Sequence, residues 1–383
     1  MEIIFWLTFT LIVYCYVGYP VVLYALASIL HKPVQKKPIE PKVALLLCAW
    51  NEEDVIGAKI KNLCALDYPK EKITFLIGSD GSDDTTDTIV ASFKDARIKL
   101  IRNEERKGKM AILKRLLDTA DAEIIVFTDA RQEMDTQAIK ELVANFNDPS
   151  VGCASGELIF RAKEGATAKG INVYWNYEKS LRKNESRIHS MLGATGAIYA
   201  ARKNLINNLP NNIILDDMYI PLSIIQKGYR AVFDGSAKAF DNAANSPKEE
   251  YRRKTRTIYG NYQIFKAFAG LFNPFQSPVA IQFFSHKLLR VLAPFLLIAL
   301  FFINIVLSDN ASYKTLLFLQ IIFYSMAVIG FIARYNNNGL FKIISRLCYI
   351  PYVFCLLNFS ALIGFVQLLS GKQTTHWKKA RKT

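Results

Sequence analysis

Long apolar runs occupy both ends of the chain, and a mixed polar and apolar region lies between them. Residues 3–30 contain no charged side chain, and three more uncharged runs cover residues 291–307, 315–333 and 347–371. Each is close to the length that crosses a hydrocarbon layer of about 30 Å. No basic residue precedes the first run, and it is too long for a cleaved signal peptide, so we predict a retained N-terminal anchor.

The central region alternates short β-branched runs with helical patterns. Strands are predicted at residues 43–48, 73–78, 97–102, 124–128 and 197–201, and helices follow the first three. This alternation predicts an α/β fold with a mostly parallel sheet and right-handed crossovers. In such a sheet the loops after the strands share one edge, where ligands bind.

Polar side chains follow three of these strands. Asp129 ends the run 124–128, where a carboxylate can hold a cation or, alternatively, cap the next turn. The first strand lacks a following GxGxxG, and Gly108-Lys109 lacks the other residues of a P-loop. The kind of site that is left is one in which acidic side chains and a cation hold a nucleotide. In such a site Asp80 could form a hydrogen bond with the base or ribose, and Lys109 could contact the diphosphate.

Charge and cysteine content exclude other classes. The net charge is +15, and its clusters at residues 31–42, 252–256 and 372–382 flank apolar runs. This favours anionic lipid headgroups over nucleic acid, although some of these residues are ordinary solvated surface. The six cysteines show no CxxC and the four histidines no HExxH, so we predict reduced thiols and no zinc site.

Six short motifs occur in one order, and together they carry a resemblance. They are Asn51-Glu52, Ser79-Asp80-Gly81-Ser82, Gly108-Lys109, Thr128-Asp129-Ala130, Gly193-Ala194-Thr195-Gly196 and Asp216-Asp217. Residues 43–260 resemble the family-2 glycosyltransferases of the GT-A fold. Within that family they are most similar to the membrane-anchored cellulose, hyaluronan and poly-N-acetylglucosamine synthase-like branch.

The resemblance implies a role for each motif. It places the nucleotide-sugar donor on a set of loop and helix residues: Asn51, Glu52, Asp80, Lys109, Asp129, Arg131, Arg253 and Arg256. Asp129 would also be the metal ligand, for Mg²⁺ or Mn²⁺. The catalytic residues would be Asp217, the base, and its neighbour Asp216. Gly193, Thr195 and Gly196 would form the acceptor-side wall, with a purely structural turn as the alternative.

This sequence departs from the family pattern at three positions. Arg131 stands where a second acid is expected, Arg253 where a Gln is expected, and Thr257 where a Trp is expected. Arg131 would weaken the metal site and grip a phosphate, or else turn to solvent. Because Thr257 offers no aromatic face, we expect a short product or a single addition. Trp175 and Tyr177 are expected to stack on a sugar or to lie in the core.

The resulting hypothesis is an inverting membrane glycosyltransferase that uses a UDP-sugar to build a cell-surface glycan. Its partners would be the donor, a glycan or lipid-linked acceptor and the bilayer, without nucleic acid. Its parts would be an anchor (1–31), a cytoplasmic GT-A domain (41–245), interfacial helices (246–285), a transmembrane region (286–371) and a basic tail (372–383).

The sequence leaves alternatives for the number of membrane crossings and for the functional class. Four simple crossings would leave the basic tail outside, against the positive-inside tendency, so residues 341–371 enter and return or another run does not cross. A catalytically degenerate scaffold subunit is the rival class. A transporter is disfavoured because the apolar runs contain no buried charge.

Overall fold

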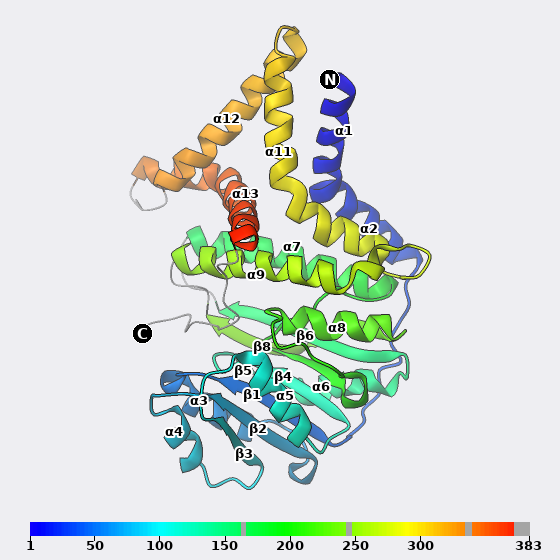
Figure 1. The fold of residues 1–383 in the computed structure, drawn as a ribbon, viewed down its shortest axis with the longest axis vertical. Helices are drawn as coiled ribbons and strands as arrows, with labels where there is room; N and C mark the ends of the chain where they lie inside the picture. The colour runs from blue at the N-terminus through cyan, green and yellow to red at the C-terminus, as the bar shows by residue number, and fades with distance from the viewer. Residues whose placement is uncertain (162–165, 243–246, 334–338, 371–383) are drawn as a thin grey trace.

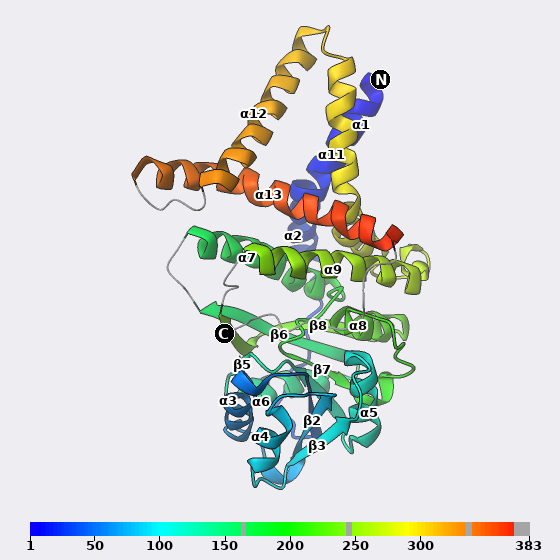
Figure 2. The ribbon, with the colours of Figure 1, turned by 60° about the vertical axis from the view of Figure 1, so that its left-hand side comes forward.

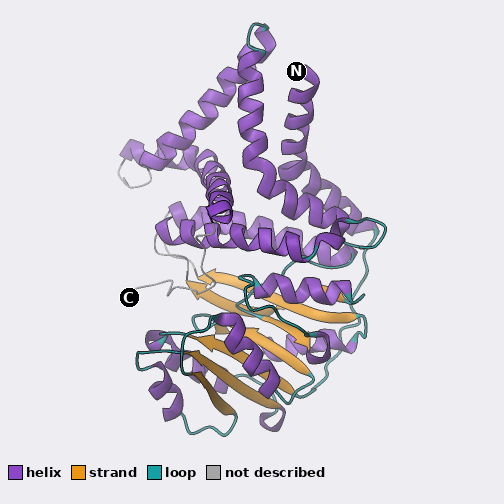
Figure 3. Ribbon diagram, viewed as in Figure 1, coloured by secondary structure: helices purple, strands orange, loops and turns teal. Residues whose placement is uncertain are grey.

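A computed structural model describes residues 1–161, 166–242, 247–333 and 339–370. The molecule is elongated. All the strands lie in one half and long apolar helices make up the other (Figures 1 and 3). Between the halves, two helices lie side by side across the end of the sheet domain: α7 (Ala166–Ile188) and α9 (Pro247–Ala267).

One sheet of eight strands organises the first half, in the order β3-β2-β1-β4-β7-β6-β8-β5. The strands are β1 (Val43–Ala49), β2 (Ile73–Asp80), β3 (Ile98–Asn103), β4 (Ile124–Thr128), β5 (Glu133–Met134), β6 (Val151–Arg161), β7 (Tyr199–Arg202) and β8 (Arg230–Asn242). The four strands β3, β2, β1 and β4 pair in parallel, whereas β7 is antiparallel to both β4 and β6. The predicted α/β class is confirmed, and the complete sheet is mixed.

Side-chain alternation in β1 explains why helices cover both faces. Leu45 and Leu47 join a core cluster with Ile60 of α3, while Leu46 joins a second cluster with Leu116 of α5. A strand that is buried on both faces reads as a continuous apolar run, which is what residues 43–48 are. The helices of this half are α3 (Glu53–Cys64), α4 (Thr86–Ser92), α5 (Lys109–Thr119), α6 (Ala138–Ala144) and α8 (Asp216–Gln226).

Four helical stretches in the described chain are long and apolar enough to cross a membrane: Glu2–Ile29, Ala280–Val306, Ala311–Ala333 and Leu347–Ser370. They comprise α1 (Glu2–Val13), α2 (Tyr19–Ile29), α10 (Ala280–Gln282), α11 (Leu289–Val306), α12 (Ala311–Ala333) and most of α13 (Gly339–Ser370). Helices α1, α11 and α12 rise away from the sheet domain, whereas α13 lies across the layer formed by α7 and α9 (Figure 2). The α13–α9 contact is close, because a Cβ on Gly364 would come within 2.7 Å of the Ile258 side chain.

The second apolar stretch begins earlier than the sequence pattern predicts. Ala280–Val306 includes His286, Lys287 and Arg290, which precede the uncharged run 291–307. His286 is 2% exposed, so the candidate span contains a buried titratable side chain just before the uncharged run. His286 and Arg290 face α7, where Glu178 contacts both side chains and Glu185 contacts His286.

Candidate functional site

Two loops at the carboxyl edge of the sheet hold each other through Asn51. Its backbone adopts φ 53°, a left-handed conformation that is uncommon outside glycine. The strain is offset by contacts with the next loop, because Asn51 N–H donates to Ser82 Oγ at 3.2 Å and Asn51 Oδ1 accepts from Asp83 N–H at 3.0 Å. Glu52 N–H donates to Thr86 Oγ1 at 2.8 Å. Asn51 and Glu52 therefore brace the loops where the sequence predicts donor binding.

Asp80 is fully buried and serves the loop before α5. Its Oδ1 accepts from Asn103 Nδ2 at 2.8 Å and from Lys107 N–H at 2.9 Å, and its Oδ2 accepts from Gly108 N–H at 2.7 Å. Both oxygens are thus engaged by protein donors. The arrangement fixes the loop that delivers Lys109, and direct contact between Asp80 and a nucleotide stays a prediction.

Lys109, Asp129 and Asp216 form the centre of the site. Lys109 is the first residue of α5, and its Nζ lies 3.3 Å from Asp129 Oδ1 and 3.1 Å from Asp216 Oδ1. Burial alone would lower the pKa of Lys109, but the two carboxylates raise it above its usual value. The ammonium is therefore charged, and it joins the end of β4 to the start of α8.

Asp217 lies beside Asp216 in the first turn of α8 and opposite Gly196. A Cβ on Gly196 would come within 3.3 Å of Asp217 Oδ2 and 3.7 Å of Asp129 Oδ2, so both carboxylates border this one glycine. In the described structure of α8 the N-cap is Leu215 and no side chain caps the helix. The two acids therefore lie in the first turn of α8 and not at its N-cap position.

The environment of Asp217 favours proton uptake. Burial raises the pKa of Asp217 to about 6, Asp216 adds to the effect, and Lys109 and Arg182 oppose it. A carboxylate with a pKa near neutrality is suited to accept a proton in a reaction and release it afterwards. The neighbouring Asp216 is 5% exposed, and its carboxylate contacts the Lys109 ammonium.

The three predicted arginines have different surroundings. Arg131 Nη2 lies 3.9 Å from Asp241 Oδ2 of β8, so a carboxylate of the protein already faces this guanidinium. The prediction that Arg131 turns to solvent is not borne out by this contact. Arg256 on α9 has a buried Nε without a hydrogen-bond partner among the described residues. Arg253 lies on the same helix, but its side chain is outside the described residues.

Thr195 belongs to a loop that is tied to three elements. Its N–H donates to Ser155 Oγ at 2.9 Å, its Oγ1 accepts from Arg182 at 2.6 Å, and Ala194 N–H donates to the Asp217 carbonyl at 2.7 Å. Sequence reasoning missed Arg182 and Ser155. They come from α7 and β6, where no sequence motif points to a functional site.

The two aromatic residues that were candidates for sugar stacking, Trp175 and Tyr177, lie on different sides of α7. The Tyr177 hydroxyl donates to the Tyr16 carbonyl at 3.0 Å, which places it against the N-terminal anchor. Trp175 packs on Phe160 of β6 with ring centroids 5.3 Å apart. Trp175 therefore lies on the sheet side of α7, near the acceptor-side loop, and Tyr177 does not.

The described residues contain no group of three or more His, Cys, Asp or Glu that could hold a metal ion alone. Asp129 is nevertheless 41% exposed at the end of β4, and its Oδ2 borders Gly196 away from Lys109. Mg²⁺ is usually bound by one or two carboxylates together with substrate phosphates and water. Asp129 thus fits a divalent cation that a bound diphosphate helps to hold.

Known proteins share this architecture. The mannosyltransferase PcManGT of Pyrobaculum calidifontis, solved with GDP-Man and Mn²⁺, superposes with a TM-score of 0.71 at 19% identity, covering 97% of this chain and all of that one. This likeness shows that the chain has the GT-A fold. More narrowly, residues 45–209 match the family "Glycosyl transferase family 2", so the chain carries a family 2 glycosyltransferase domain, and the resemblance read from the motifs is confirmed.

Sequence relatives agree with this family. "Probable glycosyltransferase YdaM" of Bacillus subtilis is 24% identical over 76% of this chain and 70% of its own length. "Beta-monoglucosyldiacylglycerol synthase" of Nostoc sp. is 33% identical over 34% of this chain, but the match covers only 29% of that protein. The protein is therefore a transferase of nucleotide-sugar donors that acts in glycan or glycolipid synthesis.

Proposed function

We propose that the protein is an inverting membrane glycosyltransferase that transfers a sugar from a nucleotide-sugar, with a UDP-sugar as the first candidate, to a glycan or lipid-linked acceptor at the cell surface. One observation carries this proposal: Asp217 and Asp129 border the same glycine, Gly196. A base and a diphosphate-binding carboxylate that flank one small space are what a single sugar displacement requires.

On the donor side, we assign two positive groups to the diphosphate. Lys109 presents a charged ammonium beside Asp129, and Arg256 brings a buried Nε that lacks a partner among the described residues. Charge-assisted hydrogen bonds from such groups stabilise the leaving diphosphate as negative charge develops on it. The Asn51–Glu52 loop and Asp80 shape the nucleotide end, the latter by holding the loop that precedes Lys109.

A divalent cation, Mg²⁺ or Mn²⁺, would be held by Asp129 together with the donor. When bound, it would supply further charge neutralisation to the diphosphate. The Mn²⁺ in PcManGT supports this assignment. Lys109 fixes Asp129 Oδ1, which leaves Oδ2 directed at the shared space beside Gly196.

On the acceptor side, Asp217 takes the proton from the attacking hydroxyl. The acceptor oxygen then forms a bond with the anomeric carbon while the bond from that carbon to the diphosphate oxygen breaks. One displacement without a covalent enzyme intermediate inverts the anomeric centre. The raised pKa of Asp217 suits this task, because a base titrating near the working pH both accepts and releases the proton.

The membrane arrangement follows from the direction of the helices. We divide the chain into an anchor (1–31), a catalytic domain (41–245), interfacial helices (246–285), an apolar region (286–371) and a tail (372–383), with the catalytic domain in the cytoplasm. Because α13 lies across the layer of α7 and α9 while α1, α11 and α12 rise from it (Figure 2), we propose three crossings and one helix in the interface. Three crossings return the chain to the catalytic side.

The proposal is tested with purified protein and a panel of UDP- and GDP-sugars, with and without a membrane lipid extract. We expect metal-stimulated release of the nucleoside diphosphate from one donor, and a labelled product in the presence of acceptor. A degenerate scaffold would bind no donor and release none. Asp217→Asn serves as the matched control, since it should abolish release without disturbing the fold.

A further inference from the structure

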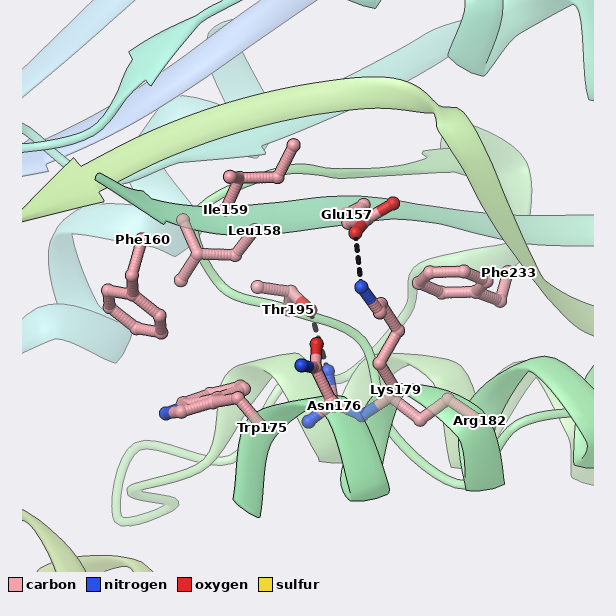
Figure 4. A pocket seen from close by; sticks show the side chains of 10 residues that line it. All are labelled: Glu157, Leu158, Ile159, Phe160, Trp175, Asn176, Lys179, Arg182, Thr195 and Phe233. Atoms are coloured by element: carbon pink, nitrogen blue, oxygen red, sulfur yellow. Dashed lines mark hydrogen bonds and ion pairs between the residues drawn. The ribbon is translucent and has the colours of Figure 1, made fainter. Parts of the chain in front are cut away.

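A cavity of about 210 Å³ lies between β6 and α7, beside the acceptor-side loop (Figure 4). Its walls combine aromatic rings, Thr195 and three charged side chains: Glu157, Lys179 and Arg182. Pockets for drug-sized ligands begin at roughly 300 Å³, so this one accepts a unit the size of a single sugar ring rather than a long oligosaccharide.

The cavity adjoins the proposed base. Thr195 lines it, and the next residue, Gly196, borders Asp217 Oδ2. Arg182 joins the two regions, because it lines the cavity, donates to Thr195 Oγ1 and lowers the pKa of Asp217. A molecule in the cavity would therefore lie next to the group that removes the acceptor proton.

One wall offers aromatic faces. The rings of Trp175 and Phe160 lie 5.3 Å apart at 56°, so the two rings meet at an angle instead of stacking on each other (Figure 4). The C–H face of a sugar ring is apolar and packs on such faces. A break in the β6–β8 register between Ser155 and Glu157 re-aims the end of β6 into the cavity, as irregular strand pairing commonly does near sites.

The other wall offers donors and acceptors together. Lys179 Nζ lies 2.7 Å from Glu157 Oε1, and these side chains are 39% and 18% exposed. A carboxylate accepts from hydroxyl groups and an ammonium donates to them, so the pair matches neighbouring hydroxyls of a sugar. A phosphate would gain Lys179, and Arg182 where it is not engaged by Thr195, but it would also face the Glu157 carboxylate, whereas a neutral ring meets no like charge.

We propose that this cavity binds the terminal sugar of the acceptor, stacked on Trp175 and hydrogen-bonded by Glu157 and Lys179, so that its hydroxyl meets Asp217. This inference rests on the proposed transferase activity and names the acceptor class: a molecule ending in an uncharged sugar.

The test uses full-length protein and p-nitrophenyl β-glycosides of glucose, galactose and N-acetylglucosamine as acceptors. Lys179→Met removes a charged hydrogen-bond donor, which corresponds to roughly a ten- to hundredfold loss in acceptor binding. Trp175→Ala should also raise the acceptor KM, and Trp175→Phe should recover most of it. In each variant the acceptor KM should rise far more than the donor KM. Lys183→Met, an exposed change on the same helix, is the matched control and should alter neither.

A binding experiment that needs no turnover tests this inference separately from the proposed function. Saturation-transfer NMR of the same glycosides with the Asp217→Asn variant should show contact that Trp175→Ala abolishes, whether or not turnover is found. Equal acceptor KM in the control and in both cavity variants would overturn the inference. Displacement of the glycosides by dodecyl phosphate more readily than by free sugars would also overturn it, because the cavity would then be an anion site. Absence of any donor turnover would instead refute the proposed function.

Discussion

Two clusters of charged side chains differ in their numbers of acidic and basic groups: one lies at the carboxyl edge of the sheet and the other at the joint with the apolar helices. At the carboxyl edge of the sheet, one ammonium, Lys109, faces Asp129, Asp216 and the nearby Asp217. At the joint with the apolar helices, the carboxylates Glu178 and Glu185 face three basic groups: His286, Lys287 and Arg290.

The joint cluster is closed. His286 Nδ1 lies 2.6 Å from Glu185 Oε1, the Tyr19 hydroxyl donates to the same oxygen at 2.8 Å, and Glu185 is 0% exposed. In the edge cluster Asp129 is 41% exposed and acids outnumber the ammonium. Paired charges in a closed site fix geometry, whereas an excess of carboxylates beside an open space leaves groups available for a cation and a proton.

The largest effect is expected at the edge cluster. Asp217→Asn removes the base and keeps the shape, so turnover should fall by roughly 10²- to 10⁴-fold while the thermal unfolding temperature stays that of the wild type. Steady-state assays and scanning calorimetry measure both. Asp118→Asn, the same change at an exposed position of α5, controls for loss of a negative charge. Near-normal turnover in the Asp217 variant would remove this residue from the role of base.

Substitution in the joint cluster, the charged group around Glu178 and Glu185, should lower stability and leave turnover unchanged. Glu185→Leu leaves His286 and Tyr19 without their shared acceptor in a buried site, which typically costs about 3–5 kcal/mol of stability. We expect a lower unfolding temperature in detergent and unchanged transfer per folded molecule. The control is Lys183→Leu on an exposed position of the same helix. An unaltered unfolding temperature would mean that the cluster contributes no stability.

Asp129→Ala tests whether, within the edge cluster, Asp129 binds the donor while Asp217 takes the proton. The carboxylate acts on the bound donor before transfer, so donor affinity should weaken by roughly ten- to hundredfold, comparable to losing a charged hydrogen bond. Titration calorimetry with the preferred donor and Mn²⁺ measures this. Asp217→Asn is the natural partner variant and should keep its donor affinity. Equal affinities in both variants would show that Asp129 does not contact the donor or its metal.

The smallest effect is expected at Arg131. Because Asp241 lies 3.9 Å from its guanidinium, Arg131→Ala removes a partly exposed ion pair, and such pairs contribute about 0–1 kcal/mol. Donor KM should change by less than about fivefold across a Mn²⁺ titration. A larger change, or a metal requirement that shifts strongly, would restore the view that this residue acts on the metal site.

Local patterns predicted the parallel half of the sheet and β7, but not β6 and β8. The run 43–48 is apolar throughout because both of its faces are covered, which makes such strands easy to recognise. β6 and β8 carry glycines and charged residues, and they pair with each other across a separation of about eighty residues with breaks in register. No local periodicity encodes that pairing.

The site residues also fall into those that sequence motifs identified and those that only long-range packing brings together. Loop motifs that follow recognisable strands located Lys109, Asp129 and Asp217, whereas Arg182, Ser155 and the joint cluster depend on α7 packing against distant segments. Glu178 and Glu185 lie seven residues apart on one face of α7, and their basic partners lie about a hundred residues later. Only the three-dimensional structure shows that these charges meet.

The stereochemistry of the product tests the central claim most directly, because a single base beside the diphosphate site permits one displacement and no covalent intermediate. Proton NMR of the glycoside formed from an α-linked nucleotide-sugar reports the anomeric configuration through its coupling constant. The account predicts a β-linked product. An α-linked product would contradict it, since retention needs a second displacement or front-face attack, and neither fits a lone Asp217 acting across Gly196 from Asp129.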